Sequence, residues 1–210
     1  MKIDTSLAAQ IVVVTASSGG GKSSIVKKKI AKHKRLVVFD PDDEYGGIAG
    51  IKKADSCQHL LQMLKDTKGG ALKVRIVAQS KAAFDFVCRA VFAWGDCGFV
   101  AEELAGRTSA GKAQGGWHTL VTRARKRAIY IYGITQRIAE ADKTIIGNAS
   151  EIYCGRLTRR VDRELIAREI DLPIEQIGKL RNLQFIRADM ATGERFAYDV
   201  KAQKEQKIPV

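Results

Sequence analysis

The chain has 210 residues, and 45% of them are hydrophobic, which is enough for one substantial core but short for two. No apolar run approaches the length that spans a bilayer, and residues 1–10 lack the charged and then apolar layout of a secretory signal. We therefore expect a soluble intracellular protein. The four cysteines form no C-x-x-C pair and the three histidines are dispersed, which favours reduced thiols over a disulfide framework or a zinc site.

The chain is strongly basic, with a formal net charge of +13 and a pI near 9.7. Such a charge favours a polyanionic partner such as nucleic acid. Solvated lysine faces without any ligand give the same composition, so charge alone leaves both interpretations open.

The first three quarters of the chain alternate between apolar, β-branched runs and helix-like segments. We expect strands at 10–16, 35–40, 71–78, 97–103 and 128–136, and helices at 23–34, 57–67, 80–94 and 117–127, where Ser80 would cap the third helix. This alternation predicts an α/β fold with a mostly parallel sheet and helices on both faces. Residues 158–170 predict a charged helix, and residues 184–200 predict a β-hairpin at an appendage or at a sheet edge.

A glycine-rich segment joins the first strand to the first helix. It fits the Walker A pattern G-x-x-x-x-G-K-[ST], except that Ala16 replaces the first glycine. Backbone amides of small residues can curl around phosphates, while the lysine reaches the β- and γ-phosphates and the following serine binds Mg²⁺. A plain flexible turn is the alternative, but the position between strand and helix favours a phosphate-binding loop (P-loop). The binding residues would be Ser17, Ser18, Gly19, Gly20, Gly21, Lys22, Ser23 and Ser24.

Two carboxylates follow the apolar run "GFVA" and are the candidate Walker B acids. Glu102 would organise the metal ion and Glu103 would polarise the attacking water. Glu102 stands where Asp is usual, and Asp96 is the competing acid, although it follows a helix-like segment and has no second acid beside it. Gln136, at the end of the next strand, could sense the γ-phosphate and position water.

Taken in order, five segments resemble the FtsK/HerA class of P-loop motor ATPases: "ASSGGGKSS", "VVFDPDDEY", "FVAEE", "RARKRAIYIYGITQR" and "ADKTIIGNASEIYCGRL". Ala124 and Ile138 depart from the class pattern, which has Gly and often Pro at these places. A chain this short is similar to the genome-packaging ATPases of tailless icosahedral viruses with an internal membrane, the tectivirus-like group. Residues 1–210 would then be a single P-loop ATPase domain, with a motor core at about 8–157 and a C-terminal extension at about 158–210.

The resemblance implies a RecA-like fold, ATP and Mg²⁺ as ligands, and a homo-oligomeric ring, which by the same resemblance would be a hexamer. One arginine would reach the ATP of a neighbouring subunit. Arg125 is our candidate because it precedes the glutamine at the class spacing, and we prefer it to Arg123, Arg127 and Arg137. Implied partners are double-stranded DNA and capsid vertex proteins, and implied locations are the host cytoplasm during assembly and the packaging vertex of the virion.

Two basic segments are candidates for contact with DNA. The loop at residues 105–116 carries Arg107 and Lys112 among glycines, a composition that suits sequence-independent phosphate contacts. The first helix has an apolar stripe, so we expect most of its lysines to point to solvent.

Together these features predict an ATP-driven translocase that packages double-stranded DNA into a preformed capsid. A cellular or plasmid HerA-like translocase is one alternative, and a nucleotide-gated DNA-binding or capsid-vertex protein with little turnover is another.

Overall fold

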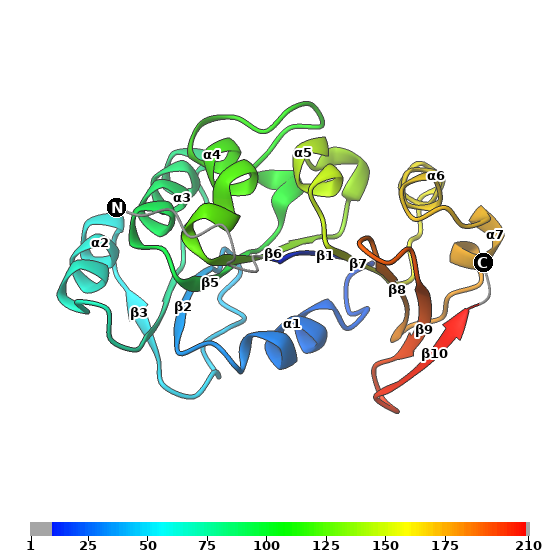
Figure 1. Ribbon diagram of the computed structural model, residues 1–210, viewed down its shortest axis with the longest axis horizontal. Helices are drawn as coiled ribbons and strands as arrows, with labels where there is room; N and C mark the ends of the chain where they lie inside the picture. The colour runs from blue at the N-terminus through cyan, green and yellow to red at the C-terminus, as the bar shows by residue number, and fades with distance from the viewer. Residues whose placement is uncertain (1–9, 209–210) are drawn as a thin grey trace.

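The structure, a computed structural model, describes residues 10–208. Residues 1–9, where we expect no secretory signal, lie outside the described residues, as do 209–210. Ten strands form one sheet in the order β10-β9-β8-β7-β1-β6-β5-β2-β4-β3 (Figure 1). The five predicted strands are present as β1 (Ile11–Thr15), β2 (Arg35–Phe39), β4 (Leu72–Ile76), β5 (Cys97–Ala101) and β6 (Ile129–Thr135).

Two further strands complete the parallel part of the sheet, β3 (Ile51–Ala54) at one edge and β7 (Glu151–Cys154) beside β1. The predicted hairpin is formed by β8 (Gln184–Asp189) and β9 (Arg195–Asp199), and it extends the sheet because β8 pairs antiparallel with β7. The prediction missed a third antiparallel strand, β10 (Lys204–Ile208). Thus the α/β fold with a mostly parallel sheet and a C-terminal hairpin is confirmed.

The helices cover both faces of the sheet (Figure 1). Helices α3 (Lys81–Trp94), α4 (Gly115–Arg123) and α5 (Lys143–Gly147) lie on one face, and α1 (Lys22–Ile30) lies on the other. Helix α2 (Cys57–Asp66) lies near the β3 edge, and α6 (Arg160–Glu169) and α7 (Ile174–Gly178) lie near the C-terminal strands. Ser80 caps α3 as predicted, since its hydroxyl accepts from the Ala83 amide at 3.1 Å.

The predicted basic helix at 117–127 is only partly α-helical. Its α-helical part ends at Arg123, and residues Ala124–Arg127 continue as a 3₁₀ turn. Ala128 then takes a left-handed conformation with φ of 52°, which turns the chain into β6. The change places the cationic end of this segment on a tight turn instead of a helix face.

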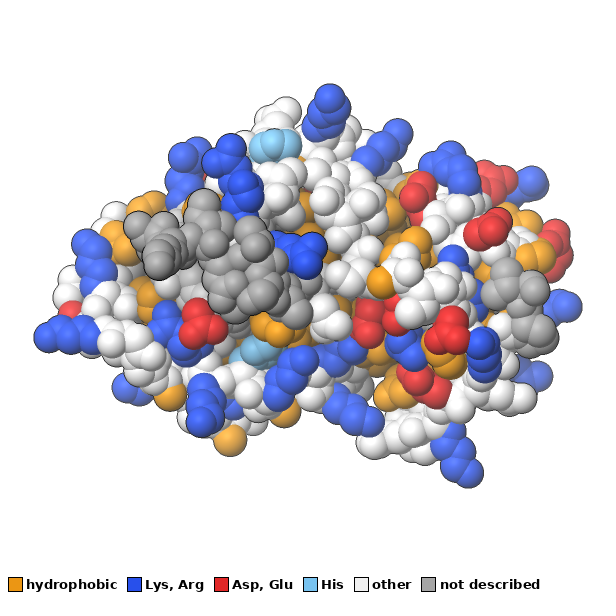
Figure 2. Space-filling model, viewed as in Figure 1, with side chains coloured by type: hydrophobic (Ala, Val, Ile, Leu, Met, Phe, Trp, Pro, Cys, Tyr) orange, Lys and Arg blue, Asp and Glu red, His pale blue; other side chains and the backbone are white. Residues whose placement is uncertain are grey.

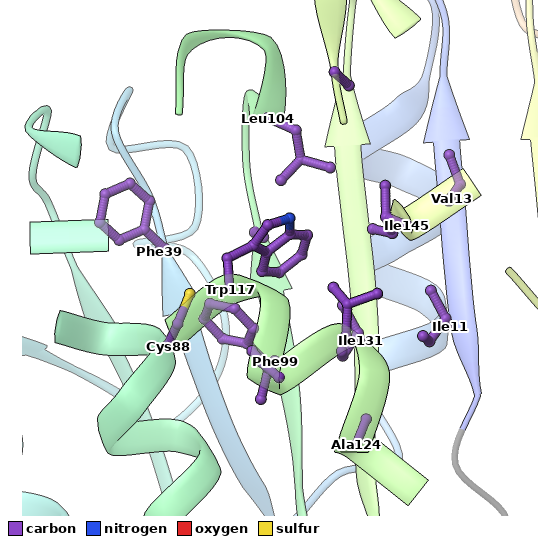
Figure 3. Close-up of a cluster of buried hydrophobic side chains, with 14 of the residues drawn as sticks. Ile11, Val13, Phe39, Cys88, Phe99, Leu104, Trp117, Ala124, Ile131 and Ile145 are labelled. Atoms are coloured by element: carbon purple, nitrogen blue, oxygen red, sulfur yellow. The ribbon is translucent and has the colours of Figure 1, made fainter. Parts of the chain in front are cut away.

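Residues of β1 alternate between two cores, which explains the continuous apolar run in its sequence. Ile11 and Val13 face α3, α4 and α5, whereas Val12 and Val14 face α1. Figure 3 shows the first of these cores, where Trp117 of α4 lies over Phe99 of β5. Within residues 10–208, no helix is both long and apolar enough to cross a membrane.

The direction of the strands decides which predicted residues can meet. Strands β1, β6, β5 and β2 are neighbours and run parallel, so the residues that follow them share one edge of the sheet. The P-loop, the Glu102 and Glu103 pair and Gln136 follow these strands. Asp96 and Arg125 precede β5 and β6, and they therefore lie at the opposite edge.

Candidate nucleotide-binding site

A pocket of about 310 Å³ opens at the carboxyl ends of the parallel strands. It brings together nearly all the predicted site residues, from three separate segments of the chain, and two further segments complete its lining. The residues that line it are Ser18, Gly19, Gly20, Gly21, Lys22, Ser23, Ser24, Asp40, Asp42, Glu44, Glu102, Glu103, Gln136 and Leu183. Strand β6 lies between β1 and β5, so Gln136 lies between the P-loop and the acidic pair.

The P-loop has a backbone that requires glycine. A Cβ atom on Gly20 would lie 2.8 Å from the Ser17 carbonyl oxygen, and Gly21 has φ of +96°. Gly21 is the N-cap of α1, and no side chain bonds to the first amides of this helix. These amides are therefore free to bind an anion, which is the property that suits a helix N-terminus to phosphate.

Lys22 is folded over the loop it follows. Its ammonium group donates to the carbonyl oxygens of Ala16 and Ser17, at 2.9 and 3.2 Å. Burial lowers the pKa of Lys22, while the carboxylates of Glu102, Glu103 and Glu44 raise it. The predicted phosphate-binding cation thus lies between the loop and the acidic side of the pocket.

The alanine at the first Walker A position fits because a glycine faces it. A Cβ atom on Gly155, which directly follows β7, would lie 2.8 Å from the Ala16 Cβ. Beside it, the Ser17 amide and hydroxyl both donate to the Arg156 carbonyl at 2.9 Å. Ser17 therefore anchors the loop to the segment after β7 instead of lining the pocket. Sequence reasoning missed Gly155, although it lies within the "CGRL" segment.

The turn after β2 brings two further residues to the site. Asp40 is fully buried and accepts from the amides of Glu44 and Tyr45, at 2.8 and 3.1 Å. Glu44 in turn accepts from the Ser23 hydroxyl at 2.9 Å. The match to Asp-Pro-x-x-Glu-Tyr pointed to this turn, but the sequence alone assigned no role to Glu44 or Tyr45.

Glu102 is held by Tyr45, whose hydroxyl donates to the Glu102 carboxylate. Burial raises the pKa of Glu102 to about 7, and the hydrogen bond from Tyr45 works in the opposite direction. Nearby Glu44 also raises this pKa. The carboxylate is therefore a buried acid whose charge is easily changed by its surroundings.

Glu103 and Gln136 meet through the end of β6. The Thr135 hydroxyl donates to the Glu103 carboxylate at 3.3 Å, and the backbone nitrogen of Gln136 lies 3.5 Å from the same oxygen. Glu103 has φ of +49°, a left-handed conformation that is uncommon for a residue with a side chain. This conformation directs Glu103 and Glu102 to different neighbours at the same sheet edge.

Asp96 does not take part in this site. It precedes β5, at the opposite edge of the sheet, where its amide donates to the Arg127 carbonyl at 2.7 Å. The structure therefore excludes Asp96 as the acid beside the P-loop and leaves Glu102 and Glu103 in that position.

Of the four candidate arginines, two are engaged within the chain. Arg137 donates to Asp162 at 3.0 Å and pairs with Glu140 at 2.7 Å, and Arg127 donates to the Phe92 carbonyl at 3.0 Å. Arg123 and Arg125 are exposed at the opposite edge from the pocket. Arg125 thus cannot serve the pocket of its own chain.

The two basic segments present their cations in different ways. Arg107 donates to the side-chain oxygen of Gln79 at 2.7 Å, so Lys112 is the exposed cation of the predicted DNA-contacting loop. Most lysines in and after α1 are exposed, as predicted, and Lys27 and Lys29 also lie over the rings of Tyr45 and Tyr153. Figure 2 shows Lys and Arg side chains spread over the visible face, with most acidic side chains on the side of the C-terminal elements.

Replacing Glu102 with Gln should stabilise the ligand-free protein at high pH. The carboxylate ionises near pH 7 in the folded chain but near its ordinary value of 4.5 in the unfolded chain. Between pH 4.5 and pH 7 this carboxyl group is ionised in the unfolded chain but still protonated in the folded chain. The free energy of unfolding therefore falls as the pH rises through this range. We expect the advantage of Glu102→Gln to grow by about 2–3 kcal/mol between pH 5 and pH 8, measured by urea unfolding without Mg²⁺ or nucleotide. An advantage that does not change with pH would contradict this.

A methyl group on Gly155 should displace the P-loop. In Gly155→Ala the new Cβ would meet Ala16 and Phe185, each at 2.8 Å, so we expect a loss of about 1–3 kcal/mol in the free energy of unfolding. Adding Ala16→Gly removes one of the two clashes and should recover part of the loss. The control is Gly147→Ala, where the new Cβ meets nothing within 4 Å. Additive effects of the two substitutions in a double-mutant cycle would rule out this contact.

Comparison with known proteins finds viral proteins that this chain resembles. No protein-family model matches the sequence. "Protein P9" of Pseudoalteromonas phage PM2 is 27% identical over 157 residues, which cover 72% of this chain and 70% of that protein.

Solved structures share the fold over nearly the whole chain. The genome-packaging NTPase B204 of Sulfolobus turreted icosahedral virus 2, in complex with AMPPCP, superposes with a TM-score of 0.69 and 17% identity, covering 96% of this chain and 98% of that one. The same NTPase in complex with ATP-gammaS gives a TM-score of 0.69 at 16% identity, covering 96% of this chain and 97% of that one. The chain therefore has the P-loop fold of a viral genome-packaging NTPase, and the resemblance to this group of proteins is confirmed.

Proposed function

We propose that this protein is an ATP-hydrolysing motor that translocates double-stranded DNA and packages a viral genome into a preformed capsid. The observation that carries the proposal is the single pocket in which the P-loop, the acidic pair and Gln136 converge. The fold shared with a genome-packaging NTPase supports the same conclusion. A P-loop alone would fit many reactions, but this combination at one sheet edge fits hydrolysis of a nucleoside triphosphate.

The residues present suit a triphosphate with its magnesium ion. Uncapped amides of α1 and the Lys22 ammonium would bind the phosphates. The Ser23 hydroxyl and the Glu102 carboxylate both line the pocket and offer oxygen donors. Such a small set of oxygen donors fits Mg²⁺, which takes few protein ligands and completes its shell with phosphate oxygens and water. Ser23 and Glu102 would hold it, and the ion would neutralise charge on the phosphates.

The two acids of the pair would then have different roles. Glu102 is held in place by Tyr45, which suits a group that orients the metal. Glu103, beside Thr135 and Gln136, would accept a proton from the attacking water, while Gln136 orients that water at the γ-phosphate. These roles follow from the positions of Glu102, Glu103 and Gln136 at the sheet edge, and all three residues come from one chain.

A ring of identical chains would complete the site. Arg125 is exposed at the sheet edge opposite its own pocket, so its guanidinium is available to a neighbour's triphosphate. An arginine supplied in this way is worth about 10³–10⁵ in turnover in related P-loop enzymes. The formal net charge of +13 suits a partner as anionic as DNA, and Lys112 is an exposed cation of the loop between β5 and α4.

Replacing Lys22 with Ala should abolish both hydrolysis and packaging. Purified wild-type protein should hydrolyse ATP faster when duplex DNA is added, and this stimulation should fall as salt is raised from about 50 to about 200 mM. Lys22→Ala should remove the activity, and in the viral genome it should yield complete particles without DNA. Normally filled particles would exclude a role in packaging. A hydrolysis rate that does not change when DNA is added would favour a role other than translocation.

Mixing two inactive variants tests whether Arg125 acts on a neighbouring chain. Arg125→Ala should keep nucleotide binding and lose hydrolysis, and Glu103→Gln should do the same. In a mixed ring, about a quarter of the interfaces would pair an intact Glu103 with an intact Arg125, so about a quarter of the wild-type rate should return. Arg123→Ala is the matched control and should remain active on its own. No recovery in the mixture would exclude action between chains.

A further inference from the structure

The C-terminal extension contributes one apolar residue, Leu183, to the lining of the pocket. Leu183 precedes β8 and lines the pocket, and Val200 follows β9. The two are joined across the hairpin, since the Val200 amide donates to the Leu183 carbonyl at 3.0 Å. Figure 1 shows these strands beside the amino-terminal end of α1.

Both side chains approach the P-loop closely. A Cβ atom on Gly21 would lie 2.8 Å from Leu183 Cδ2 and 3.6 Å from Val200 Cγ2. Next to Leu183, the Asn182 side-chain amide donates to the Gly19 carbonyl at 3.3 Å. The extension is therefore fixed against the loop that would hold the phosphates, and Leu183 is directed toward the pocket.

The conformation of Leu183 is unfavourable on its own. Its φ of +67° is left-handed, and for a residue with a branched side chain this is rare and costs free energy. A glycine or asparagine would adopt this left-handed conformation at a lower cost in free energy. The backbone alone therefore does not account for a leucine here, and its side chain is the part that faces the pocket.

The pocket is polarised along the order of the strands. Strands β2 and β5, which precede Asp40, Glu44, Glu102 and Glu103, lie on one side of β1, and β7 and β8 lie on the other. A bound triphosphate would direct its terminal phosphate to the acidic side, where Glu102 and Glu103 lie. The nucleoside at its other end would then lie on the side of Leu183.

We propose that Leu183 and Val200 form the surface on which the nucleobase packs, so that the C-terminal hairpin binds the nucleoside end of the substrate. This inference rests on the proposed function, since it requires a nucleoside triphosphate in the P-loop. Packing of a planar base on aliphatic side chains is favourable and does not distinguish strongly between bases. The hairpin would thereby detect whether a nucleotide is present.

The test compares ATP with inorganic tripolyphosphate, which carries the phosphates but no nucleoside. Leu183→Gly removes the side chain, and because it also relieves the left-handed backbone, which offsets part of the lost packing, the variant should still fold. It should bind Mg²⁺–ATP about tenfold more weakly, as expected for loss of one buried aliphatic contact, and bind Mg²⁺–tripolyphosphate unchanged. Val200→Ala should show the same selectivity with a smaller loss.

Lys68→Gly is the matched control, because Lys68 is also left-handed, with φ of 44°, but lies in the turn between α2 and β4. It should not alter the affinity for either ligand. Equal weakening of ATP and tripolyphosphate by Leu183→Gly would mean that Leu183 only shapes the P-loop, and it would overturn the inference. So would unchanged affinity for ATP. If the wild-type protein binds neither ligand, the proposed function itself fails, which is a distinct result.

Discussion

The acidic half of the site depends on one buried carboxylate, that of Asp40. It is fully buried at the end of β2, and it accepts from the amides of Glu44 and Tyr45 and from Arg75 at 3.2 Å. A buried carboxylate is costly unless donors satisfy it, so the chain after β2 is held in one tight turn. That turn places the Tyr45 hydroxyl on Glu102 and Glu44 beside Ser23. The P-loop and the acidic pair are thereby coupled through a segment that belongs to neither.

The remaining walls of the pocket come from both halves of the sheet. The parallel strands deliver polar groups to one edge because their carboxyl ends coincide there. The antiparallel hairpin reaches the same edge from the other side of β1, and it supplies Leu183. A single sheet thus combines a charged end and an apolar end in one pocket. The extension, which the sequence predicts as an appendage or a sheet edge, extends the sheet and also lines the pocket through Leu183.

Much of the fold and the central site could be predicted from the sequence, because local patterns determine them. The apolar run of β1 indicates burial on both faces, and the P-loop glycines and Lys22 follow at fixed spacing. Gly155 and Leu183 could not be assigned, since their roles depend on contacts with Ala16 and Gly21 across the sheet.

The contacts of the α1 lysines likewise could not be predicted from the sequence. Helical periodicity separates the apolar stripe of a helix from its polar face, but it does not show what lies beyond that face. In the folded chain Lys29 pairs with Glu151 at 2.6 Å and lies over Tyr153, a residue that is distant in sequence. Arg107 likewise resembles a free loop cation until α3 and the turn before it bring Gln79 alongside. Charge along a sequence is therefore a weaker guide to a binding surface than glycine spacing is to a phosphate loop.

The electrostatics of the pocket would favour a triphosphate that binds together with a divalent cation over one that binds alone. Burial and the neighbouring Glu44 raise the pKa of Glu102 to about 7, so its negative charge is unfavourable in the free protein. A triphosphate alone would add further negative charge beside Glu44, Glu102 and Glu103, with Lys22 as the buried cation nearest to them. A divalent ion would offset both sets of charge at once. The same burial that makes a charged Glu102 costly in the free chain would therefore be offset when a divalent ion binds beside it.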